Sequence, residues 1–160
     1  MNCAPTTARN RRAEYDARGR LTKFYDALGR ARTVTYDGAG RVVKTVSAEG
    51  RDVRFVHDGA GRVVEKRYKE YPASGSDTVF AYAYDAAGNT TVATGGGVRV
   101  EYAYNEANQV TNARIRDADG AETVTRYAYD GAGRMTTESV TANGGTASAV
   151  TYMRDAIGRV

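Results

Sequence analysis

The chain has 160 residues and a formal net charge of +4, with 18 Gly and 12 Tyr but no Trp, one His and one Cys. One Cys excludes an intrachain disulfide, and no apolar run approaches the roughly 18 residues that a membrane span requires. Lys and Arg are spread along the chain instead of forming the basic stripe of a nucleic-acid-binding protein. We therefore expect neither nucleic-acid binding nor membrane insertion, and the many Gly and Tyr residues favour turns and strands over helices.

The first 14 residues differ from the rest of the chain. They contain no apolar stretch that resembles a signal sequence, and they lack the pattern that follows. We expect residues 1–14 to be a disordered basic arm and residues 15–160 to be a repeat array of about six repeats plus a truncated seventh.

A hexad of the form Tyr-Asp-x-x-Gly-Arg recurs along the array. It reads YDARGR from Tyr15, YDALGR from Tyr25, YDGAGR from Tyr36, HDGAGR from His57, YDAAGN from Tyr84, YNEANQ from Tyr104, YDGAGR from Tyr129 and RDAIGR from Arg154. With the copy at Tyr25 taken as internal to its unit, the repeats start 20 to 27 residues apart. This period accommodates two short strands and two turns.

The chemistry of the hexad predicts a hairpin turn. Its Asp can accept a hydrogen bond from the backbone N–H two residues on, and its Gly permits a positive φ. Tyr and Arg then flank the turn on opposite strands, where we expect the ring to pair with the guanidinium group, and a bulge at the Gly would shift the register by one residue. The residues assigned to these turns are Tyr15, Asp16, Gly19, Arg20, Tyr36, Asp37, Gly40, Arg41, Asp58, Gly61, Arg62, Tyr84, Asp85, Gly88, Tyr129, Asp130, Gly133 and Arg134.

Alternation before each later turn predicts strands. Positions two residues before the hexad Tyr form an aromatic and β-branched face: Val34, Phe55, Tyr82, Tyr102, Tyr127 and Tyr152. Positions immediately before it predict a second face, whose side chains are small to medium in size and mostly apolar: Thr35, Val56, Ala83, Ala103, Ala128 and Met153. The predicted fold is all-β, with tandem hairpins in a continuous antiparallel sheet that twists and coils.

The tyrosine ladder is the strongest candidate for a binding site. Tyr82, Tyr102 and Tyr127 recur at equivalent positions with Arg nearby, which is how sugar-stacking surfaces are built. The alternative interpretation, which we favour, is that these rings fill the inner face of the sheet and hold neighbouring repeats together.

No catalytic, cofactor or metal site is predicted. His57 occupies a hexad Tyr position and Cys3 lies in the unpatterned arm, so the two residues do not suggest a nucleophile with its base. The run from Asp117 to Gly120, with Glu122, resembles part of a calcium loop but lacks the ligand spacing of an EF-hand.

The unit YDARGRLTKFYDALGRARTVTYDGAGRV, from Tyr15 to Val42, resembles the YD repeat of bacterial Rhs and wall-associated proteins, which are related to the teneurins. The resemblance covers residues 15–160. It implies a partial arc of a spiralling β-sheet shell that encapsulates a C-terminal toxin and helps to deliver it to competing cells. An alternative role in the family is carbohydrate binding at the cell surface. The sequence departs from the family in having fewer repeats than a closed shell needs and in lacking the DPxGL motif that precedes the toxin.

The resemblance also implies partners and a location. The expected partners are the remaining YD repeats and toxin domain of a larger Rhs protein, together with secretion-system components or surface glycans. As part of such a protein the chain is expected to be secreted or at the cell surface. Without a signal peptide of its own, it is expected to be cytoplasmic if it stands alone.

Overall fold

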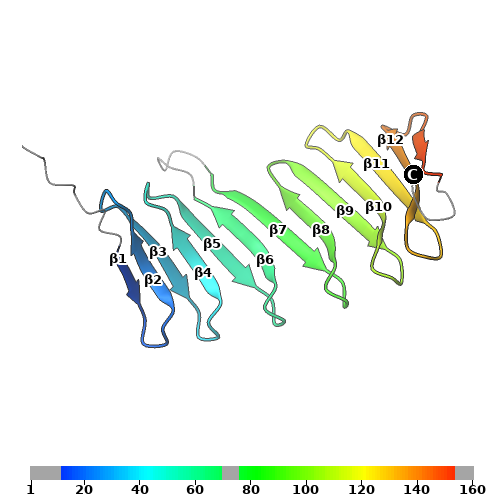
Figure 1. Ribbon diagram of the computed structural model, residues 1–160. Coiled ribbons are helices and arrows are strands. Elements are labelled where there is room, and N and C mark those ends of the chain that lie inside the picture. The colour runs from blue at the N-terminus through cyan, green and yellow to red at the C-terminus, as the bar shows by residue number, and fades with distance from the viewer. Residues whose placement is uncertain (1–11, 70–75, 154–160) are drawn as a thin grey trace, which may run out of the picture. The chain divides into compact units, whose positions relative to one another are not determined.

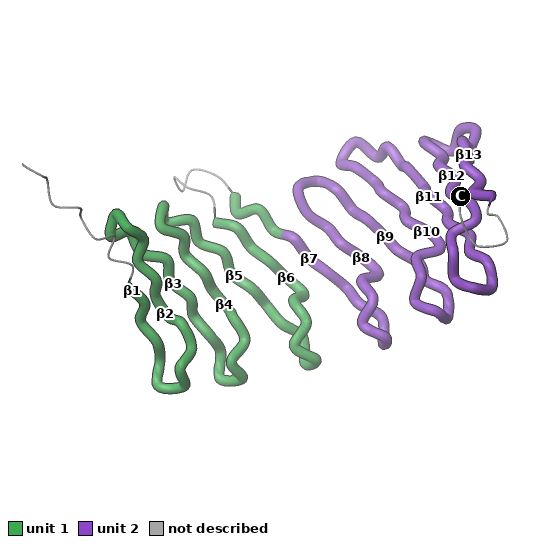
Figure 2. The backbone as a smooth tube through the Cα atoms, viewed as in Figure 1, with its two compact units in different colours: residues 1–79 green, residues 80–160 purple. Residues whose placement is uncertain are grey.

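The computed structural model describes residues 12–69 and 76–153, and all regular structure in these two ranges is β-strand (Figure 1). None of the described residues belongs to a helix that could span a membrane. The chain divides into two compact units, residues 1–79 and residues 80–160 (Figure 2). In both units, consecutive strands pair in antiparallel fashion, which confirms the all-β hairpin fold predicted from the hexads.

In the first unit, six strands follow one another in chain order within the described residues, and each pairs with the next. They are β1 (Arg12–Tyr15), β2 (Leu21–Tyr25), β3 (Ala31–Tyr36), β4 (Val42–Val46), β5 (Asp52–His57) and β6 (Val63–Tyr68). Hexad turns join β1 to β2, β3 to β4 and β5 to β6. The hexad turn over residues 26–30 and the turn over residues 47–51 connect the hairpins at the other end of the strands.

The second unit has the same organisation. Its strands are β7 (Thr78–Tyr84), which starts two residues before the boundary, β8 (Thr90–Gly95), β9 (Val98–Tyr104), β10 (Val110–Arg116), β11 (Glu122–Tyr129), β12 (Met135–Ala142) and β13 (Ser148–Thr151). Hexad turns join β7 to β8, β9 to β10 and β11 to β12. The hexads therefore all lie at one end of the hairpins in this unit.

Strand structure is already present three residues before the predicted boundary, at the first described residue, Arg12. Ala13 pairs with Phe24 and Glu14 with Lys23, so the chain before the first hexad already supplies a strand. The pairing is favourable because Glu14 and Lys23 carry opposite charges across the ladder, and the Tyr25 hydroxyl donates to Glu14 Oε1 at 3.1 Å. The rest of the predicted arm, with Cys3, and the hexad from Arg154 lie outside the described residues.

The described residues of the two units form no core of the usual kind. Among the described residues only Val124 is a buried hydrophobic side chain, with 7% of its surface exposed. Most strand residues are half-buried, because each unit is a single layer of strands with no second layer packed on it. A sheet with one apolar face normally buries that face against another element. The folded units therefore retain an apolar face that is available for further contacts.

Candidate functional site

The hexad turn is held by its aspartate. Asp16 Oδ1 accepts hydrogen bonds from the backbone N–H of Arg18 at 2.9 Å and of Arg20 at 3.0 Å. Asp16 Oδ2 accepts from Arg20 Nε at 2.7 Å. One carboxylate thus binds the backbone with one oxygen and the guanidinium with the other. Gly19 completes the turn with a φ of 75°, in the region that favours glycine.

The same arrangement recurs at the later turns. The Arg Nε atom donates to the Asp of its own turn at 2.7 or 2.8 Å in the pairs Arg30–Asp26, Arg41–Asp37, Arg62–Asp58 and Arg134–Asp130. Asn89 takes the place of the Arg and donates to Asp85 Oδ2 at 2.9 Å. In the most divergent copy, Asn108 replaces the Gly with a φ of 59°, which Asn tolerates better than most residues.

These hydrogen bonds favour the charged form of the turn aspartates. The backbone hydrogen bond from Arg41, followed by the bond from its side chain, lowers the pKa of Asp37. The corresponding bonds from Arg62 lower the pKa of Asp58 in the same order. The lowered pKa values reflect structural hydrogen bonds, and the turn interactions account for them without an acid–base role in catalysis.

The hexad tyrosines connect consecutive hairpins. The Tyr36 hydroxyl donates to the carbonyl oxygen of Leu21, the first residue of β2, at 2.9 Å. Tyr104 makes the same bond to Thr90 at the start of β8, at 2.7 Å. Tyr129 repeats it with the carbonyl of Val110 at 2.7 Å. Each of these hydroxyls therefore binds the backbone of the preceding hairpin.

The hexad arginines reach the following repeat. The guanidinium carbon of Arg20 lies 4.4 Å from the ring centroid of Tyr36, and Arg41 Nη1 donates to the carbonyl of Asp58 at 3.0 Å. The prediction that Tyr and Arg of one hexad pair with each other is therefore wrong. Arg20 binds the Asp of its own turn and the ring of the next repeat, which leaves Tyr15 63% exposed.

A β-bulge accompanies six of the seven described hairpins that a hexad turn closes. The exception is the β2–β3 hairpin, which the hexad from Tyr25 closes without a register shift. In the other six hairpins, the register skips one residue of the second strand just after the turn, so the expected one-residue shift is present. The skipped residue is β-branched in every case: Thr22, Val43, Val64, Thr91, Thr111 and Thr136.

The second face of the sheet is charged and open to solvent, which corrects the prediction of a mostly apolar face. All six residues assigned to it are exposed. Their cross-strand neighbours include charged side chains, such as Lys44 opposite Thr35 and Glu65 opposite Val56. Lys44 pairs with Asp52 at 3.0 Å. The sequence positions before the hexad Tyr are apolar or small, but the return strands supply the charges.

The three candidate sugar-binding tyrosines all lie in the second unit. Tyr82 on β7 and Tyr102 on β9 each face an alanine on the next strand, Ala93 and Ala113. Tyr127 on β11 faces Glu138. Burial, and next the charge of Glu138, raises the pKa of Tyr127. The three rings hold equivalent positions in successive hairpins, but none is directly opposite another across a strand pair.

The sequence that contains the hexads matches the model of a known repeat family. The family model described as RHS Repeat matches residues 15–52 and 104–146, just over half of the chain. The chain belongs to the RHS repeat family. The resemblance seen in the unit from Tyr15 to Val42 is thereby confirmed.

The RHS-repeat chain is also similar to crystal structures of much larger proteins. Its TM-score with TcdB2-TccC3-Cdc42 is 0.56 at 15% identity, over 90% of this chain and 10% of that one. With TcdB2-TccC3 without hypervariable C-terminal region, the TM-score is 0.58 at 14% identity, over 92% and 10% of the two chains. The likeness concerns the fold, and the RHS-repeat chain spans about a tenth of the length of either structure. No curated protein matches it.

Two turns of the RHS-repeat chain that contain no hexad are closed by the same backbone hydrogen bonds. In the turn over residues 47–51, Ser47 Oγ accepts from the backbone N–H of Glu49 and of Arg51, both at 3.2 Å. In the turn over residues 117–121, Asp117 Oδ1 accepts from Ala121 N at 2.9 Å. A Gly in the fourth place of each turn was the available signal. The run that resembled a calcium loop is thus a repeat turn, and no cluster of metal-binding side chains occurs in the described ranges.

Proposed function

We propose that this chain is a structural repeat segment of an Rhs-type protein, and that it forms part of a β-sheet shell which encapsulates a C-terminal toxin and helps to deliver it in competition between bacteria. Its partners are the remaining YD repeats and the toxin domain of the larger protein. It is exported as part of that protein and carries no catalytic site of its own.

The observation that carries this proposal is the single-layer sheet. Each unit has one charged, solvent-exposed face and one apolar face that no other described element covers. A wall around an enclosed space needs two such different faces. A compact domain would instead bury its apolar face in a core of its own.

The contacts between repeats support the same proposal. Each hexad closes its own turn, while Tyr hydroxyls and Arg side chains of hexads bind the neighbouring hairpin. Such an array is extended by adding hairpins, because each repeat depends mainly on its neighbours. The larger structure of TcdB2-TccC3 without hypervariable C-terminal region has the same fold over the part that matches.

The proposal is tested on the product of the whole encoding locus. We expect further repeats beside this segment and an unrelated C-terminal domain that resists protease in the full product but is digested when it is expressed alone. A locus that encodes no further repeats, or a C-terminal domain that is digested equally in both forms, would show that this chain is not part of an enclosing shell.

Carbohydrate binding is a second candidate function. Tyr82 and Tyr102 are half-buried and each stands opposite a small alanine, which leaves room beside the rings for a flat ligand. Tyr127 has the carboxylate of Glu138 opposite it, as an acceptor for sugar hydroxyls. A glycan panel titrated into the isotope-labelled chain should shift the resonances of these three tyrosines saturably, and no shift across a broad panel would remove this function.

A further inference from the structure

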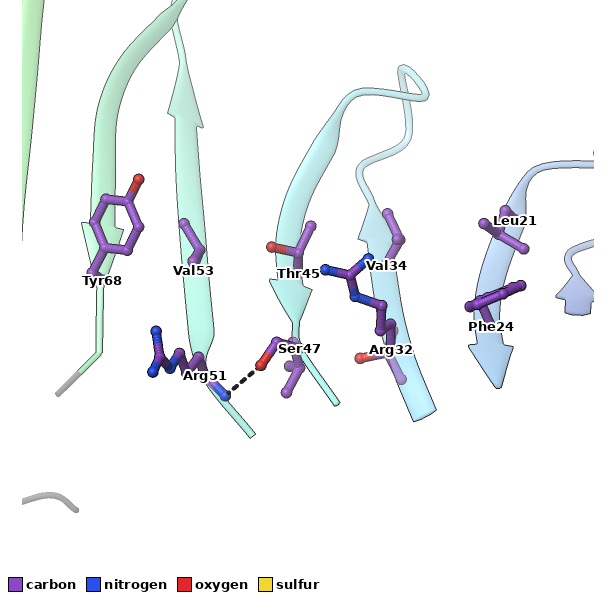
Figure 3. A pocket seen from close by; sticks show the side chains of 11 residues that line it. Leu21, Phe24, Arg32, Val34, Thr45, Ser47, Arg51, Val53 and Tyr68 are labelled. Atoms are coloured by element: carbon purple, nitrogen blue, oxygen red, sulfur yellow. Dashed lines mark hydrogen bonds between the residues drawn. The ribbon is translucent and has the colours of Figure 1, made fainter. Parts of the chain in front are cut away.

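The first unit contains an open pocket of about 540 Å³ on the apolar face of the sheet (Figure 3). It extends from β2 to β6, and its lining residues belong to five consecutive strands and to the turn over residues 47–51. It is separate from the candidate tyrosines, which belong to the second unit. The proposal made from it goes beyond the structural role and does not depend on it.

The floor and the walls of the pocket are apolar. Leu21, Val34 and Val53 line the pocket from three different strands, and Phe24 and Tyr68 stand at opposite ends (Figure 3). All except Tyr68 are half-buried, and Tyr68 is 37% exposed. An aliphatic or aromatic group of a ligand would gain burial here at about 25 cal/mol per Å² of apolar surface removed from water.

One arginine of the pocket is released from the usual turn interaction. In the aspartate turns, the last arginine is bound by the carboxylate, as Arg41 is by Asp37 at 2.7 Å. Ser47 takes the aspartate position in the turn over residues 47–51. Its hydroxyl still accepts the two backbone bonds, but it offers no charge to Arg51. Within the described residues, the Arg51 guanidinium makes no hydrogen bond or ion pair.

A second arginine of the pocket is also unpaired. Arg32 lies on β3 opposite Phe24 and makes no hydrogen bond or ion pair within the described part of the chain. The charge of Arg32 acts on the carboxylate of Glu49, but the ion pair of Glu49 is with Arg30, at 3.6 Å. Most other arginines of the strands are paired on the charged face, as Arg99 is with Glu101 at 2.7 Å. Two unpaired cations above an apolar floor are therefore a local feature of this pocket.

We propose that this pocket binds an extended acidic peptide segment, with an apolar side chain on the floor and carboxylates on Arg32 and Arg51. Guanidinium groups bind carboxylates through paired, charge-assisted hydrogen bonds, and Arg32 and Arg51 are both exposed and accessible to a carboxylate. Complementarity of charge selects an acidic partner. The aliphatic floor selects a peptide over a saccharide, because Leu21, Val34 and Val53 offer no partners to sugar hydroxyls.

The test uses the full chain and three synthetic probes. They are the acetylated and amidated peptide Asp-Leu-Phe-Asp, its uncharged counterpart Asn-Leu-Phe-Asn, and a hyaluronan tetrasaccharide that carries carboxylates without apolar side chains. Affinities are measured by calorimetry, and the site is mapped by backbone chemical shifts. We expect the acidic peptide to bind at least about tenfold more tightly than the other two probes.

Variants identify the site. Arg32→Gln and Arg51→Gln should each weaken binding of the acidic peptide by about tenfold, because each removes one charged partner of a carboxylate. Arg54→Gln is the matched control. Arg54 lies on β5 next to the pocket, but its side chain pairs with Asp52 at 3.5 Å on the other face of the sheet. This control should leave the affinity unchanged.

Ser47→Asp separates binding from stability. The new carboxylate should bind Arg51 as in the other turns, so the urea midpoint should rise while peptide affinity falls about as far as in Arg51→Gln. A variant that lost affinity by misfolding would show the opposite change in the midpoint.

Three results would overturn the proposal. One is an affinity that does not change in the variants at Arg32, Arg51 and Ser47. Another is equal binding of the uncharged peptide or of the tetrasaccharide. The third is concentration-dependent self-association that Ser47→Asp abolishes, since the occupant would then be a second copy of the chain.

Discussion

At the scale of single residues, the repeat depends on a carboxylate that binds backbone and side chain together. Asp37 accepts from the Arg41 backbone at 2.9 Å through one oxygen and from its Nε through the other. Replacing the carboxylate by a hydroxyl, as at Ser47, keeps the turn and loses the ion pair. The turn conformation and the pairing of the arginine are thus separable properties.

This chemistry predicts acid sensitivity. Asp37, Asp58 and Asp130 have pKa values lowered by hydrogen bonds from the arginine of the same turn, first from its backbone. The stability that they contribute is fully present above the unfolded-state pKa of about 3.9 and is lost as pH falls through the folded-state values. The urea midpoint, followed by circular dichroism, should stay level from neutral pH down to about pH 5 and then decrease.

The control for this prediction is the double variant Asp37→Asn with Asp58→Asn. It should have a lower midpoint at neutral pH and a shallower decrease in acid, because two of the titrating groups are gone. An equally steep decrease in this variant would assign the acid sensitivity to other carboxylates.

Gly95 provides a second prediction at this scale. An added Cβ would lie 2.6 and 2.7 Å from Cε1 and Cγ of the Phe80 ring, which covers the glycine from the neighbouring hairpin strand. Gly95→Ala should therefore destabilise the chain by about 1–3 kcal/mol, the usual cost of overpacking. Gly131→Ala is the control, since nothing lies near that position. Equal urea midpoints for the two variants would contradict the close packing of Phe80 on Gly95.

At the scale of hairpins, the turns could be predicted from the sequence, but the side-chain contacts between neighbouring hairpins could not. The hexad holds its own interactions within six residues, so the chemistry of Asp16 and Gly19 could be predicted from spacing alone. The stacking of Arg20 on Tyr36 could not, because it depends on how the pairing of β2 with β3 places one hairpin beside the next. The charged face escaped prediction for the same reason, since the return strands that carry it have no fixed motif.

The bond between hairpins can be tested at Tyr104. Its hydroxyl donates to the Thr90 carbonyl at 2.7 Å. Tyr104→Phe leaves that acceptor without its partner and should reduce the free energy of unfolding by about 1 kcal/mol, measured by urea denaturation. Tyr82→Phe is the matched control, because no hydrogen bond of the Tyr82 hydroxyl is found within the described residues. A loss of the same size in both variants would mean that the hydroxyl bond does not hold the hairpins together.

At the scale of the whole molecule, each strand is held by its neighbours in the sheet, and residues 12–69 and 76–153 form no central core. β1 and β13 each have one paired neighbour among the described strands, β2 and β12, which leaves an edge with free backbone groups at each. All four residues of β13 are exposed, and Val150 has 56% of its surface accessible. Exposed edges of this kind recruit other chains unless charge or proline protects them.

We therefore predict that the isolated chain self-associates. Sedimentation velocity should show an apparent mass that rises with concentration, because unpaired edges and an apolar face remain available. Val150→Lys places a charge on β13 and should shift the distribution toward the monomer. Thr151→Lys is a second edge variant, with the charge on the opposite face of the same strand. Comparing the two variants separates pairing through the edge from contact through the apolar face.

If both variants reduce association, the backbone edge is responsible. If Val150→Lys alone reduces it, the apolar face is the contact, and a monomer at all concentrations in the unmodified chain would show that neither surface is adhesive.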